Sequence, residues 1–116
     1  MGLDMADMDS RAVIVADAAG IIRFWSLGAE AMLGHRSEDV VGKSVELLIP
    51  EFFREQHWAG FHAAMRNAAM AEPREDFVVP VEIADGTIEP AVSSLSLIRD
   101  AQGGAVGAIA VMLPQD

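Results

Sequence analysis

Residues 77–113 read FVVPVEIADGTIEPAVSSLSLIRDAQGGAVGAIAVML, a pattern typical of a β-sheet. Its β-branched and apolar residues form three strand-like runs, at 77–83, 87–98 and 105–113. The turn formers Asp85-Gly86 and DAQGG at 100–104 separate these runs, so we expect two successive hairpins. Pro80 cannot donate a hydrogen bond to an interior ladder, which places the first of the three strands at a sheet edge.

The first half of the chain predicts another hairpin, followed by helices. AVIVA at 12–16 and IIRFW at 21–25 flank a turn that ends at Gly20. Ser26 is a suitable N-cap for a short helix that stops at Gly34. The N-terminal pair of strands should therefore lead directly into short connecting helices.

A longer helix is expected over residues 50–69, because Pro50 and Glu51 both suit a first helical turn. The order of elements is then two strands, several helices and three strands. Since strands and helices do not alternate, the pattern predicts the α+β class. We expect one five-stranded antiparallel sheet with short helices and the longer helix packed on one face.

Length and composition limit the possible partners. The 116 residues fit one domain, which we place at 11–114. A frayed or helical leader at 1–10 precedes it. A net charge of −10 with eight Lys and Arg disfavours nucleic acid and anionic membranes. The absence of cysteine excludes disulfides, thiolate metal sites and cysteinyl cofactor adducts. The apolar stretch at 104–113 has only about half the length that a membrane-spanning helix needs. A cytoplasmic location is therefore expected.

The predicted long helix carries one histidine among apolar residues. At 100° a residue, His57 shares a side with five apolar residues, namely Phe53, Gly60, Phe61, Ala64 and Ala68. Glu55 and Arg66 fall on the opposite side. The small residues leave a flat space beside the imidazole that suits a planar apolar ligand. A neutral imidazole there could bind haem iron, or it could be a core histidine satisfied by a backbone carbonyl.

Three segments, in order and spacing, resemble the PAS sensory domain family. They are VADAAGIIRFW at 15–25, EAMLGHRSEDVVGKSVELLIP at 30–50 and DGTIEPAVSSLSLIRDAQGGAVGAIAVM at 85–112. The resemblance implies a five-stranded antiparallel sheet that faces helices around a ligand pocket. On the strand at 87–98, alternation then puts Ala91, Ser93, Leu95 and Leu97 on the pocket side.

The segment LIPEFFREQHWAGFHAAM at 48–65 resembles the haem-binding PAS oxygen sensors of the FixL type, in which a histidine after Pro-x-x-x-R-x-x-H binds the iron. The resemblance implies haem b, with His57 as its metal ligand. The implied cofactor-binding residues are His57, Phe53, Phe61, Ala64, Phe77, Val79, Leu95 and Leu97.

Three positions depart from that subgroup. Phe77 occupies the place of the arginine that steadies bound oxygen, which would favour CO, NO or a redox role over O2. Ala63 and Ala71 replace residues expected at the haem propionates, and the candidate substitutes are Arg74, Arg66 and Lys43.

The main functional hypothesis is therefore a haem-binding sensor of a diatomic gas or of redox state. The alternative is a haem-free module that binds flavin or another small apolar ligand, or that serves dimerisation. An enzyme is not expected, since the sequence has no Gly-x-Ser-x-Gly elbow and no metal-ligand cluster. The expected partners are a small diatomic or apolar ligand, a second copy of the chain, and an output domain such as a histidine kinase, cyclase or chemoreceptor in cis or trans.

Overall fold

Five strands form one sheet in the computed structural model, which describes residues 10–69 and 77–115. The strands are β1 (Ala12–Asp17), β2 (Ile22–Trp25), β3 (Phe77–Glu82), β4 (Ile88–Arg99) and β5 (Ala105–Pro114). Their order is β2-β1-β5-β4-β3, and all neighbours are antiparallel. The predicted architecture is confirmed, and β3, which contains Pro80, is an edge strand as expected. Residues 1–9 of the predicted leader lie outside the described residues. The same is true of Ala71 and Arg74.

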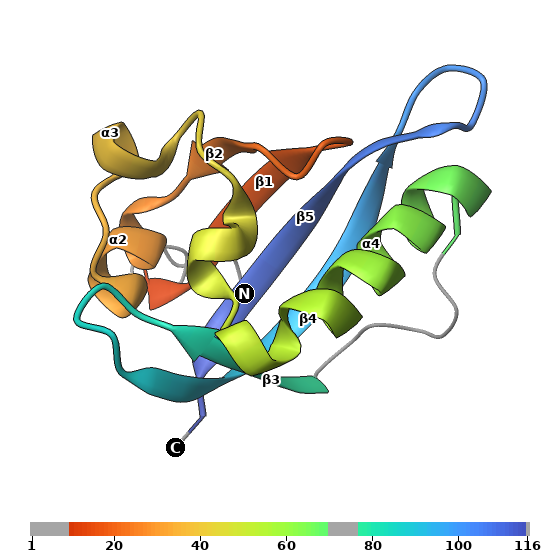
Figure 1. Ribbon diagram of the computed structural model, residues 1–116. Coiled ribbons are helices and arrows are strands. Elements are labelled where there is room, and N and C mark those ends of the chain that lie inside the picture. Colours follow the sequence, from red (N-terminus) through yellow and green to blue (C-terminus); the bar gives the residue numbers. More distant parts are fainter. Residues whose placement is uncertain (1–9, 70–76, 116) are drawn as a thin grey trace, which may run out of the picture.

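The helices lie between β2 and β3 in the chain and on one face of the sheet (Figure 1). They are α2 (Leu27–Leu33), α3 (Ser37–Val40), the 3-10 turns η1 (Val45–Leu48) and η2 (Glu51–Phe53), and α4 (Arg54–Asn67). Ser26 caps α2 by accepting a hydrogen bond from the Ala29 amide, as predicted. The predicted longer helix is η2 followed by α4. In the part of the chain that the structure describes, no helix is long and apolar enough to span a membrane.

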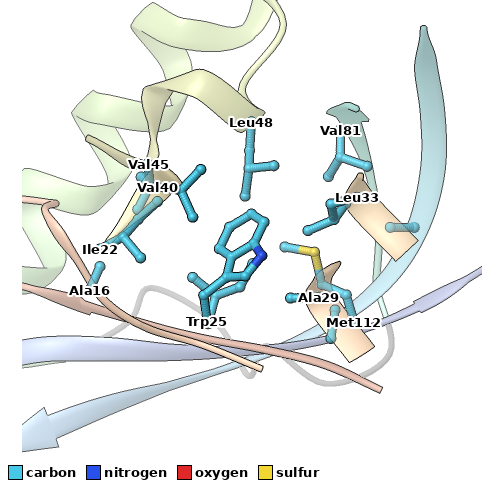
Figure 2. Packing of buried hydrophobic residues seen from close by; sticks show 13 residues of the cluster. Ala16, Ile22, Trp25, Ala29, Leu33, Val40, Val45, Leu48, Val81 and Met112 are labelled. Carbon is cyan, nitrogen blue, oxygen red and sulfur yellow. The ribbon is translucent and has the colours of Figure 1, made fainter. Parts of the chain in front are cut away.

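The hydrophobic core lies under α2, α3 and η1, around the indole of Trp25 (Figure 2). Trp25 is 3% exposed, and its Nε1 donates a hydrogen bond to the His35 carbonyl oxygen at 2.9 Å. Leu33, Val40 and Leu48 surround the ring. α4 contributes no buried residue to this core. This helix therefore crosses the remaining half of the sheet without filling the space beneath it.

The outer face of the sheet is apolar and uncovered by any helix of residues 10–69 and 77–115. Residues paired across antiparallel strands point to the same face. On this face Phe24 pairs with Val15, while Val78, Val92 and Leu113 form a row across β3, β4 and β5. Phe24 and Val78 are each about half exposed. Such a surface commonly contacts another chain.

Candidate functional site

A cavity of about 270 Å³ lies between α4 and the inner face of the sheet. Its floor contains two rows across the strands, Leu95–Ala110–Ile14 and Leu97–Ala108–Ala16. Gly60 and Ala64 lie above it on α4. Because small side chains face one another across this gap, neither layer can fill it, and a hollow remains.

All eight residues predicted to bind a cofactor line this one cavity. Four come from α4 and the turn before it, two from β3 and two from β4: His57, Phe53, Phe61, Ala64, Phe77, Val79, Leu95 and Leu97. The predicted inward face of β4 is also present, with Ser93 lining the cavity and Ala91 buried in the core. Ala68 is different, because it ends α4 in the left-handed conformation, at φ 52°, and does not line the cavity.

The sequence analysis missed the part of the lining that comes from β1, η1 and β5. The missed residues are Ile14, Ala16, Val45, Leu48, Ile49, Ala108, Ala110 and Met112, together with Gln56, Met65, Pro80 and Val81. The alternation of Ala108, Ala110 and Met112 along the last strand was the available signal. This alternation indicates that the three residues share one face of β5. That the face lies under α4 follows only from the pairing of β1 with β5.

His57 is the distinctive polar group of the cavity. Its Nδ1 is buried and has no hydrogen-bond partner, and no hydrogen bond among the described residues holds the other ring nitrogen. The alternative of a core histidine satisfied by a backbone carbonyl is therefore not found among the described residues. A buried nitrogen without a partner costs about 1–3 kcal/mol.

The His57 imidazole is uncharged at neutral pH. Burial lowers its pKa below the ordinary value of 6.5, because the charged form loses hydration. The carboxylate of Glu46 acts in the opposite direction and raises this pKa, while His62 lowers it further. A neutral ring offers one hydrogen-bond donor and one acceptor.

Aromatic contacts orient this part of α4. The rings of His57 and Phe61 are nearly parallel, with centroids 6.1 Å apart, and Trp58 meets His57 edge-on at 4.8 Å. Trp58 Nε1 donates a hydrogen bond to Glu46 Oε1 at 2.9 Å, which ties the helix to η1. The same indole rests on Gly20, where a Cβ would approach it to 2.5 Å. Trp58 is thus an internal contact of this helix.

Both ends of α4 are fastened over the cavity. Arg54 Nε at the start of the helix donates to the Ile49 carbonyl oxygen at 2.8 Å. At the other end, Arg99 Nη1 donates to the carbonyl oxygens of Ala68 and Gly103. Between these points the helix buries no residue. Polar contacts therefore fix the two ends of α4, while partly buried side chains such as Trp58 pack its middle against the domain.

The lining is almost entirely apolar. Its only polar side chains among residues 10–69 and 77–115 are Gln56, His57 and Ser93, and none of the lining residues carries a permanent charge. The described part of the chain contains no group of three or more His, Asp or Glu side chains that could hold a metal ion. The volume lies just below the roughly 300–1,000 Å³ typical of pockets that enclose drug-sized ligands. A small apolar molecule fits these dimensions.

A five-stranded antiparallel sheet whose helices enclose an apolar cavity is the architecture of a sensory ligand-binding domain. The chain belongs to the PAS fold family, whose model matches residues 7–114. An uncharacterised protein of Azorhizobium caulinodans is 40% identical to it over an alignment of 91 residues that covers 75% of this chain. The matched region spans only 12% of that relative.

Solved structures share the fold at low sequence identity. A PAS domain from Colwellia psychrerythraea has a TM-score of 0.78 at 23% identity, over 91% of this chain and 86% of that one. A light-oxygen-voltage domain studied with a flavin analogue has a TM-score of 0.73 at 14% identity, over 95% and 81% of the chains. The PAS domain of the Cronobacter turicensis RpfR quorum-sensing receptor, in complex with BDSF, has a TM-score of 0.70 at 13% identity, over 92% and 95%.

Proposed function

We propose that this PAS domain senses a small, largely apolar molecule that binds without haem in the cavity under α4. The observation that carries the proposal is an apolar hollow of about 270 Å³ with one unpartnered imidazole in its wall. β4 and β5 form much of the floor, so an occupant contacts the same strands that form the outer face of the sheet. A neighbouring fold, the RpfR receptor domain, was solved in complex with BDSF, which supports ligand binding as a use of this architecture.

Haem b remains a second candidate because His57 is neutral and its ring nitrogens are free, as an iron ligand requires. The size of the cavity weighs against it. So does the uncharged lining, since buried haem propionates need cationic or hydrogen-bonding partners. Phe77 lies in the wall where a distal donor would be needed for oxygen. Non-covalent flavin, suggested by the light-oxygen-voltage neighbour, meets the same limits of volume and charge.

An absorption spectrum of the purified protein tests this choice. We expect a colourless protein that stays colourless after incubation with excess haem or flavin mononucleotide and removal of the unbound cofactor. An intense Soret band that disappears in His57→Ala would contradict the haem-free proposal. A retained flavin absorption band would contradict it as well.

We also propose that the outer sheet face mediates homodimerisation, since Phe24, Val78 and Leu113 expose apolar surface there. Light scattering coupled to gel filtration should give the mass of two chains for the wild type. Phe24→Glu should shift the mass toward one chain, because a charge buried in an apolar interface is costly. Leu27→Glu is the control, since Leu27 is 70% exposed but lies on α2, across the sheet. A wild-type monomer, or an equal shift in the control, would contradict this proposal.

A further inference from the structure

We infer that the cavity selects an uncharged aromatic molecule of one or two rings that carries a single O–H or N–H group, the chemistry of phenols and indoles. This inference rests on the proposed function and specifies its ligand class. Four properties of the site lead to it: the volume, the charge, the aromatic walls and the free imidazole.

Volume and charge together exclude the larger and ionised candidates. A hollow of about 270 Å³ suits one or two rings better than a long chain or a macrocycle. No lining residue in the described part of the chain carries a positive charge that could pair with a carboxylate or a phosphate. Of the two groups that act on His57 by charge, the Glu46 carboxylate acts more strongly than His62, and it would repel an anion. An unpaired buried anion is strongly disfavoured, so the ligand should be uncharged.

The walls favour an aromatic ligand over an aliphatic one. Phe53, Phe61 and Phe77 line the cavity from three elements, and the His57 and Phe61 rings lie 22° from parallel. Aromatic pairs gain energy in offset-stacked or edge-on arrangements, so a planar aromatic occupant can pack against these rings. The opposite wall is aliphatic, from Leu95 and Leu97, and tolerates a flat ring.

His57 supplies the polar contact. No hydrogen bond from the described residues occupies either ring nitrogen, so the imidazole keeps its hydrogen-bonding capacity for an occupant. Its neutral form contains one acceptor nitrogen, which suits a ligand that donates one hydrogen bond. Ser93 and Gln56 complete the polar part of the lining, the first at the buried floor and the second at the exposed rim.

Three molecules that share one ring system test the inference: 2-naphthol, naphthalene and 2-naphthoate. Titration of the whole chain, followed by calorimetry or tryptophan fluorescence, should rank 2-naphthol first. Its affinity should exceed that of naphthalene by roughly three- to tenfold, the equivalent of one hydrogen bond. The carboxylate should bind at least about tenfold more weakly than 2-naphthol, since its charge is left unpaired.

The His57→Phe variant, which keeps a ring but removes both nitrogens, should reduce the ratio between 2-naphthol and naphthalene to about one. In the wild type, the imidazole ¹⁵N resonances of His57 should move with 2-naphthol and not with naphthalene, a readout that does not depend on the folding of a variant. Equal or tighter binding of 2-naphthoate would overturn the inference, as would an unchanged ratio in His57→Phe. If naphthalene binds as tightly as 2-naphthol, the ligand class is wrong but the apolar site stands. If no compound binds, the proposed function fails as well.

Discussion

Ala64→Phe is expected to weaken the binding of 2-naphthol by roughly 5- to 150-fold, the equivalent of the 1–3 kcal/mol that overpacking costs. Ala64 lines the cavity on the face of α4 that carries His57 and Phe61. A benzyl group in place of its methyl group would occupy much of a hollow of about 270 Å³. Because α4 buries no residue in the core, the helix can accept the larger side chain while the rest of the domain stays folded.

Calorimetric titration of wild type and variant measures this effect, and thermal unfolding confirms that both are folded. Ala59→Phe provides the matched control, since Ala59 lies on the same helix but is exposed and does not line the cavity. The control should bind like the wild type. Undiminished binding by a folded Ala64→Phe would show that small molecules do not occupy the space under α4.

Trp25→Ala is expected to lower the free energy of unfolding by about 3–5 kcal/mol, the usual cost of truncating a buried aromatic residue. Trp25 lies at the centre of the core, 3% exposed, and its indole N–H bonds to the His35 carbonyl oxygen. The substitution leaves a cavity and removes that bond. Since the free energy of unfolding of small domains is only about 5–15 kcal/mol, the substitution removes a large part of it.

Urea unfolding monitored by circular dichroism measures the change. Trp58→Ala is the comparison, since Trp58 is half-buried and packs at the edge of the core. It should cost less than Trp25→Ala. A loss below about 1 kcal/mol in Trp25→Ala, the level of an ordinary point mutation, would contradict the central role of this residue.

Much of the fold could be predicted because its signals are local. Inward-facing and outward-facing residues alternate in the run from Phe77 to Leu113, and Asp85-Gly86 forms a turn within it. These patterns depend only on neighbouring residues. Pro80 even identified the edge strand. The end of α4 was less predictable, because apolar periodicity continues to Ala68 while the chain there adopts a left-handed conformation.

The candidate site was predictable on one side only. The helical wheel around His57 identified Phe53, Phe61 and Ala64, because spacing along a helix determines which residues share a face. The floor from β1 and β5 was missed, since it depends on which strands become neighbours. Whether the His57 nitrogens find partners depends on every residue packed around the ring, and no pattern in the sequence contains that information.

The binding of a small aromatic molecule under α4 is tested most directly by ¹H–¹⁵N and ¹H–¹³C spectra of the labelled protein during titration with 2-naphthol. The largest shifts are expected at His57, Ala64, Leu95 and Leu97, which surround the cavity from both layers. The outer-face residues Phe24 and Val78 should change least. Saturable shifts confined to the outer face, or no shifts up to the solubility limit, would contradict it.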